Sequence, residues 1–126
     1  MPDPNIPDEF DVYTLVMLRR PQAAPALSDE VLDQLQERHL AYRAELRRSG
    51  AIVVNGPFDE QSDPSFRGMA IFSCSPAEAA RLTEGDPSVA AGRLTYEVMH
   101  WWVGAGSLAF PLAQDPVGLR REMPEV

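Results

Sequence analysis

Residues 28–50 are SDEVLDQLQERHLAYRAELRRSG, and this stretch decides the fold because it predicts one long amphipathic helix. Ser28 is a favourable N-cap residue, and Gly50 supplies the stop. At about 100° per residue, the core-facing residues fall within a single stripe about 100° wide. The stripe consists of Val31, Leu32, Leu35, His39, Tyr42 and Leu46. A histidine therefore lies in a stripe where a leucine would pack better.

The segments around this helix predict the rest of the fold. Residues 10–18, 51–55, 68–74 and 94–103 are predicted strands. A second helix begins at a capping box, Ser75 to Glu78, and ends at Gly85, whereas residues 86–92, DPSVAAG, predict a turn. The order β-α-β-β-α-β predicts an α+β, ferredoxin-like fold, in which an antiparallel four-stranded sheet carries two helices on one face.

Residues 10–103 form the predicted domain, between two segments of different character. Residues 1–9 carry three prolines and three acidic residues and predict a disordered N-terminal lead-in. Residues 104–126 form a C-terminal extension and are a candidate for wrapping a dimer partner. The fourth strand offers apolar side chains to both faces of the sheet, and two helices cannot cover both. A homodimer packed sheet to sheet is therefore predicted.

The composition argues against several classes of function. The formal charge is −8, and all eleven basic residues are arginine, so a Schiff-base lysine is excluded. An acidic chain disfavours nucleic acid and membrane surfaces as partners, although local arginine patches leave room for a small anionic ligand. The single cysteine, Cys74, cannot form an internal disulfide, and we find neither a leader pattern nor an apolar run of about 18–20 residues. These features predict a cytoplasmic location.

Two residues are candidates for acid–base chemistry, and each has a structural alternative. The imidazole of His39 titrates near neutral pH, so it could act as a general acid or base, or it could be a neutral core histidine bonded to a carbonyl. Asp86 could orient His39 and stabilise its imidazolium, or it could cap a short turn that begins at Pro87. The dipeptide Gly56-Pro57 ends a strand and is most simply a turn.

We predict neither a metal nor an organic cofactor. The two histidines and the one cysteine do not have the spacing of metal ligands. The chain also contains no P-loop, dinucleotide-binding fingerprint or nucleophile elbow.

Three features in the same order resemble the YciI-like (YCII-related) family. They are ERHLAYRAELRRSGAIVVNGP (37–57), Gly68 at the start of a strand, and DPSVAAG (86–92), within a resemblance that covers about residues 10–103. The resemblance implies a ferredoxin-like chain that dimerises as an α+β barrel. It also implies that a histidine–aspartate pair, matching His39 and Asp86, is the catalytic centre, and that the Gly56-Pro57 turn lies near the pocket. The longer acidic N-terminus and the C-terminal extension depart from the family pattern, so they could reshape that pocket.

These expectations combine into three hypotheses. In the first, the protein is a cofactor-independent lyase or isomerase of a small, partly apolar metabolite, with His39 as acid or base and Asp86 orienting it. The candidate pocket walls are Tyr13, Tyr96, Gly56 and Pro57. In the second, the pair only hydrogen-bonds a ligand in a binding module or regulatory accessory dimer. In the third, the pocket of a structural dimer is vestigial, and His39→Leu would stabilise the protein.

Overall fold

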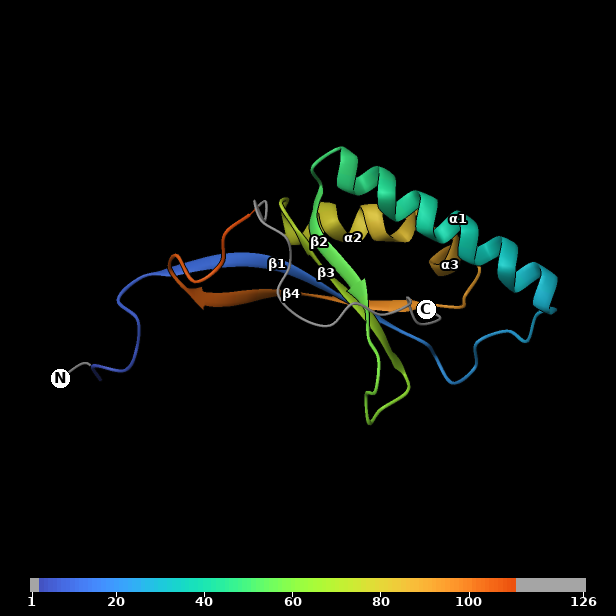
Figure 1. Cartoon of the computed structure of the whole chain (residues 1–126), viewed down its shortest axis with the longest axis horizontal. Helices are drawn as coiled ribbons and strands as arrows, with labels where there is room; N and C mark the ends of the chain where they lie inside the picture. The colour runs from blue at the N-terminus through green and yellow to red at the C-terminus, as the bar shows by residue number, and fades with distance from the viewer. Residues whose placement is uncertain (1–2, 111–126) are drawn as a thin grey trace.

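The computed structural model describes residues 3–110, which form a four-stranded antiparallel sheet with helices on one face (Figure 1). In chain order the elements are β1 Phe10–Arg19, α1 Asp29–Arg48, β2 Ile52–Pro57, β3 Phe66–Phe72, α2 Pro76–Glu84, α3 Pro87–Ala90 and β4 Thr95–Gly104. The strand order across the sheet is β2-β3-β1-β4. The predicted α+β, ferredoxin-like fold is confirmed, and the strand ends lie within two residues of their predicted positions.

Local sequence signals fix where the helices begin. The Ser28 hydroxyl accepts a hydrogen bond from the backbone N–H of Val31 (3.3 Å), and the Ser75 hydroxyl accepts one from that of Glu78 (3.2 Å). Within the predicted turn at residues 86–92, the structure instead contains the short helix α3. It forms there because Asp86 caps the segment and a proline occupies its first position.

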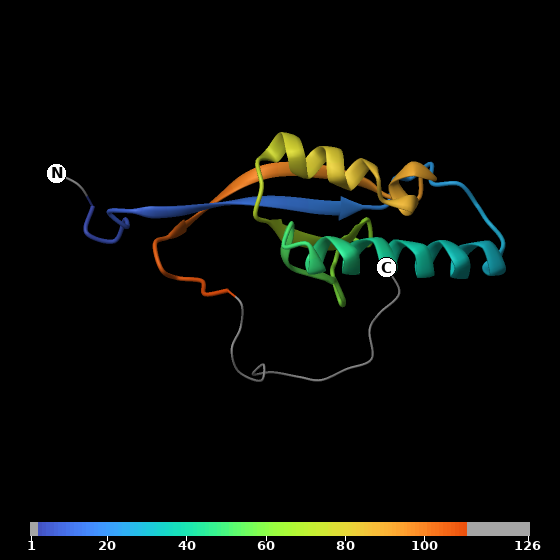
Figure 2. The same cartoon turned by 90° about the horizontal axis from the view of Figure 1, so that it is seen from above.

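The core lies between the sheet and the two longer helices, which run along the same side of the sheet (Figures 1 and 2). Its buried residues are Val16, Leu18, Leu46, Ile52, Ala70, Phe72, Ala79 and Leu94. Val31 departs from the predicted helix stripe, since its side chain is 43% exposed. The first turn of α1, which contains Val31, extends beyond the end of β1 (Figure 2).

The other face of the sheet carries apolar side chains that no helix among the described residues covers. Tyr13 pairs with Trp101 and Leu15 pairs with Met99 across β1 and β4. Met99 is 39% exposed and Trp101 is 38% exposed. We call this surface the open face of the sheet.

The segments that flank the predicted domain are described in part. Residues 3–9 contain neither helix nor strand, and the Ile6 N–H donates to the Asp3 carbonyl (3.1 Å) in a turn. The predicted wrapping extension, residues 104–126, lies outside the described residues after Phe110. Within the described range, no helix combines the length and apolar character needed to cross a membrane.

Candidate functional site

The structure brings His39 of α1 against Asp86 at the start of α3, although the two residues are 47 positions apart in the chain. His39 Nδ1 lies 2.9 Å from Asp86 Oδ1 and 2.7 Å from Oδ2. Both side chains are buried, with 3% of His39 and none of Asp86 exposed. An ionised carboxylate only accepts hydrogen bonds, so Nδ1 carries the proton and Nε2 is left for another partner.

Asp86 makes both of the contacts that the sequence offered as alternatives, one that caps α3 and one with His39. Its Oδ1 accepts a hydrogen bond from the backbone N–H of Ser88 (2.9 Å), which caps α3, while both carboxylate oxygens lie against His39. The cap therefore fixes the orientation of the carboxylate, and the carboxylate fixes the orientation of the imidazole.

Tyr42 holds the end of α2, the element that directly precedes Asp86. Its hydroxyl donates a hydrogen bond to the Leu82 carbonyl (2.6 Å) and lies so close to Gly85 that an added Cβ would collide with it. A side chain at position 85 would therefore displace the Tyr42 hydroxyl from this contact. This contact between α1 and α2 sets where the chain enters α3, and so where Asp86 meets His39.

His39 lines a pocket of about 210 Å³ between α1 and the edge of the sheet formed by β2 and β3. The other lining residues are Leu18, Leu40, Arg43, Ala44, Arg47, Asn55, Gly56, Pro57, Gly68 and Met69. Of the residues predicted from the sequence, His39, Gly56 and Pro57 line this pocket directly, and Asp86 contacts His39. Four predicted residues thus meet at one place.

The two tyrosines that were predicted as pocket walls, Tyr13 and Tyr96, lie away from this pocket. Tyr13 is on the open face, with its ring centroid 6.5 Å from that of Trp101. The Tyr96 hydroxyl donates to Glu84 Oε1 (2.7 Å) at the end of α2, and this bond is the main reason that the pKa of Tyr96 is raised. Neither tyrosine lines the pocket at His39.

Sequence reasoning missed Arg43, which lies one helical turn after His39 and is only 3% exposed. Arg43 Nη1 lies 4.0 Å from Asp86 Oδ2, and the guanidinium carbon is 5.9 Å from the centre of the Phe72 ring. Burial lowers the pKa of Arg43, and the nearby carboxylate of Asp86 opposes this effect. The available signal was its spacing, since position i+4 places Arg43 in the same stripe as His39.

Sequence reasoning also missed Asn55, which a β-bulge turns toward the pocket. The pairing of β2 with β3 shifts between Ile52 and Val54. As a result Ile52 pairs with Phe72 and Asn55 pairs with Ala70, and both of these partners belong to the core on the helix side. Asn55 Oδ1 is buried and has no hydrogen-bond partner among residues 3–110. No sequence signal marks this bulge.

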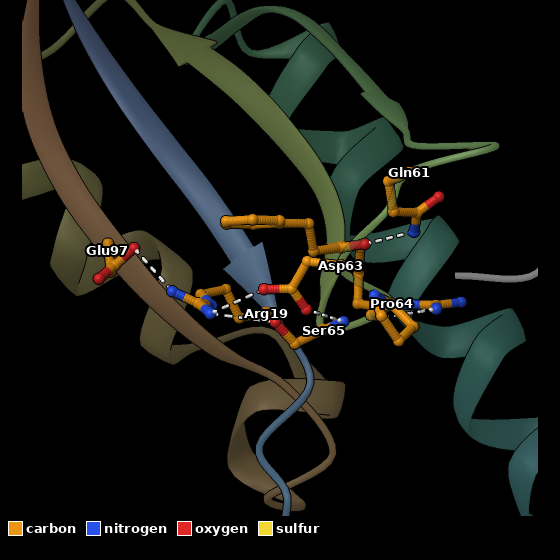
Figure 3. A network of polar contacts seen from close by, with 8 residues as sticks. Arg19, Gln61, Asp63, Pro64, Ser65 and Glu97 are labelled. Carbon is orange, nitrogen blue, oxygen red and sulfur yellow. Dashed lines mark hydrogen bonds and ion pairs between the residues drawn. The ribbon is translucent and has the colours of Figure 1, made fainter.

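The loop between β2 and β3 is held at its base by Arg19 (Figure 3). Arg19 Nη2 donates to the Ser65 hydroxyl (3.0 Å) and lies 3.7 Å from Asp63 Oδ2, while Nη1 lies 3.7 Å from Glu97 Oε2 on β4. These contacts connect the loop to β1 and β4. They hold the connection between the two strands that carry Gly56, Pro57 and Gly68 at the pocket.

No group of three or more histidine, cysteine, aspartate or glutamate side chains in the described part of the chain is arranged to hold a metal ion.

Comparisons with known proteins identify the family from the sequence and support the fold from the structure. A family model described as the YCII-related domain matches residues 12–102. The structure is similar to that of 5-chloro-2-hydroxyhydroquinone dehydrochlorinase from Burkholderia phenoliruptrix, solved in complex with 2,5-dihydroxybenzoquinone. The TM-score is 0.52 and the sequence identity 23%, and the match covers 71% of this chain and 92% of that one. At this identity the likeness is evidence for the fold alone. No curated protein matches the sequence.

Proposed function

The chain belongs to the YCII-related domain family, and we propose that it is a cofactor-independent acid–base enzyme, a lyase or an isomerase of a small, partly apolar metabolite. One observation carries the proposal: a buried histidine is bonded through Nδ1 to a buried aspartate while the same ring lines a pocket. A core histidine with a purely structural role needs the hydrogen bond but not the pocket.

The proposed mechanism uses the two imidazole nitrogens separately. His39 Nε2 accepts a proton from a carbon or hydroxyl of the substrate, and the carboxylate of Asp86 stabilises the imidazolium that forms. Nε2 then returns the proton to another substrate atom in an isomerisation, or to the departing group in an elimination. Asp86 is a positioning residue here, because its contact with the substrate is made only through His39.

The apolar part of the lining supports this use of the pocket. Leu18 and Leu40 supply apolar side chains beside the imidazole. Such a surface reduces competition by water and strengthens the electrostatic contacts made during proton transfer. The structural neighbour is named as a dehydrochlorinase, which catalyses an elimination of the class proposed here. Its named compounds are therefore the first ones to test.

The substitution His39→Asn tests the catalytic role most directly. The amide of asparagine keeps an N–H donor near the position of Nδ1, so Asp86 retains a partner, while Nε2 is lost. Wild type and variant would be incubated with 5-chloro-2-hydroxyhydroquinone and related hydroxylated rings, and chloride release and products would be measured. We expect conversion by the wild type only. His100→Asn, at the exposed histidine of β4, is the matched control, and equal conversion by His39→Asn would sink the proposal.

A second candidate function is a non-catalytic binding module or regulatory accessory dimer. The polar side chains of Arg43 and Asn55 in the pocket favour it, since they could hold a ligand that undergoes no reaction. One measurement separates the two functions. After prolonged incubation, the ligand of a binding module is chemically unchanged, whereas the substrate of an enzyme is converted.

We also propose that the protein is a homodimer that packs through the open face of the sheet. Support comes from Met99 and Trp101, large apolar side chains that are more than one-third exposed on that face.

A further inference from the structure

Proton transfer by His39 gives Arg43 no role, although Arg43 is buried in the same pocket. Its side chain is 3% exposed, and its guanidinium carries a fixed charge and five N–H donors. Nη1 is buried and makes no hydrogen bond to any of residues 3–110. A buried charged donor without a hydrogen bond costs free energy, so native structures seldom keep one without a use.

Asp86 does not accept a hydrogen bond from Arg43 Nη1. The distance of 4.0 Å between Arg43 Nη1 and Asp86 Oδ2 is well beyond that of a hydrogen bond, about 2.7–3.2 Å. The carboxylate is already bonded to His39 Nδ1 and to the Ser88 N–H. The ring of Phe72 attracts the guanidinium from its face and uses none of the N–H groups.

Asn55 presents the opposite kind of group to the same cavity. Its Oδ1 is a buried acceptor without a hydrogen-bond partner in the described part of the chain, and the bulge in β2 directs it to the helix side. Arg47 lines the pocket as well and is exposed, so it adds positive charge at the opening. A cationic donor and a neutral acceptor therefore line one small, otherwise largely apolar pocket.

We infer that this pocket binds a small organic anion, with a carboxylate or an ionised ring hydroxyl on Arg43 and a neighbouring hydroxyl that donates to Asn55 Oδ1. The inference rests on the proposed function, because it names the substrate class of the same site. An oxyanion is the natural partner of a guanidinium, which can donate two parallel N–H bonds to a carboxylate. The cavity of about 210 Å³ lies below the range of about 300–1,000 Å³ for drug-sized ligands, which fits a single ring.

The overall charge of the chain makes this local arrangement informative. A formal charge of −8 gives no general attraction for anions, so binding of an anion must come from the arginines at the pocket. Salicylate is a suitable probe, because one ring carries a carboxylate beside a hydroxyl donor. Salicylamide is its neutral counterpart with nearly the same shape.

The test is a calorimetric titration combined with NMR of the two histidine rings. We expect salicylate to bind, to shift the signals of His39 but not those of His100, and to bind about tenfold or more tightly than salicylamide. Arg43→Met should weaken salicylate binding by about tenfold or more. Arg48→Gln is the matched control, because Arg48 is exposed and paired with Glu45 (2.6 Å), and it should leave the affinity unchanged.

Asn55→Asp tests the same idea without removing Arg43, and it carries the test if Arg43→Met does not fold. Its added carboxylate would place a negative charge in the same pocket and repel the anion, so salicylate affinity should again fall by about tenfold or more. The inference is overturned if salicylate does not bind, if salicylamide binds equally well, or if Asn55→Asp binds salicylate as the wild type does. These measurements involve no turnover, so a failure of the catalytic proposal would be seen separately, as equal conversion by His39→Asn.

Discussion

Asp86 caps α3 and is proposed to orient His39 for catalysis, and one substitution can separate these two roles. Asp86→Asn keeps a side-chain oxygen for the Ser88 N–H, so α3 stays capped. The amide group would then face His39 Nδ1 and donate to it, which moves the imidazole proton to Nε2. Because Nε2 could no longer act as a base, we expect turnover to fall by about 10²- to 10⁴-fold while the fold is kept.

The nitrogen chemical shifts of the His39 ring would report this change of tautomer, which a purely structural role for Asp86 does not predict. Asp33→Asn, at an exposed position on α1, is the control for the loss of one negative charge. An unchanged tautomer together with unchanged turnover would show that Asp86 serves only as a cap.

The pairing of His39 with Asp86 also reverses an expectation about stability. For a vestigial pocket, the sequence predicted that His39→Leu stabilises the protein. The structure shows that leucine would leave the fully buried carboxylate of Asp86 without its imidazole partner. We now expect His39→Leu to lower the free energy of unfolding by about 3–5 kcal/mol, and the double variant with Asp86→Asn to recover part of it. Urea unfolding measures both, and a more stable His39→Leu would count against an ionised Asp86.

At the scale of elements, what could be predicted depends on how local the signal is. The start of α2 depends only on neighbouring residues, Ser75 to Glu78, so the sequence predicted its N-cap residue correctly. The face of the sheet on which Asn55 lies depends on a bulge in the pairing of β2 with β3. No residue next to Asn55 in the sequence indicates this bulge. Tyr13 and Tyr96 were offered together as pocket walls, but their side chains lie on opposite faces of the sheet. A strand pattern alone does not say which face holds a site.

The contacts of the loop between β2 and β3 predict that the loop becomes less stable at low pH. Hydrogen bonds from the side chain and backbone of Ser65 lower the pKa of Asp63, and Arg19 lowers it further (Figure 3). A carboxyl whose pKa is lowered by folding stabilises the folded form above its ordinary pKa of about 4, and this contribution is lost as pH falls through the lowered value.

We therefore expect amide protection in residues 58–65 to decrease below about pH 4 in the wild type. Asp63→Asn keeps the acceptor for Ser65 without a titrating group, so its loop protection should hardly depend on pH. Hydrogen exchange followed by mass spectrometry, corrected for intrinsic rates, would measure this. Equal acid sensitivity in the two proteins would assign the effect to other carboxyls.

At the scale of the whole molecule, the two faces of the sheet pose different problems. The helix face is covered by α1 and α2 over the core and carries the pocket, while Val12 and Trp102 stay exposed on it, and the open face keeps Met99 and Trp101 exposed. The sequence predicted this imbalance, because β4 alternates apolar side chains to both sides. It could not predict the covering surface, since that depends on contacts which a single chain does not contain.

Trp101→Glu tests whether a second copy covers the open face. In a sheet-to-sheet dimer this substitution would bury a carboxylate among apolar side chains, at a cost large enough to separate the subunits. We expect the wild type to sediment at twice its chain mass of 13.9 kDa and Trp101→Glu to sediment as a folded monomer. Val31→Glu adds the same charge at an exposed apolar residue on α1 and should stay dimeric. If Trp101→Glu kept the wild-type mass, the subunits would have to meet through another surface, and the open face would need a different cover.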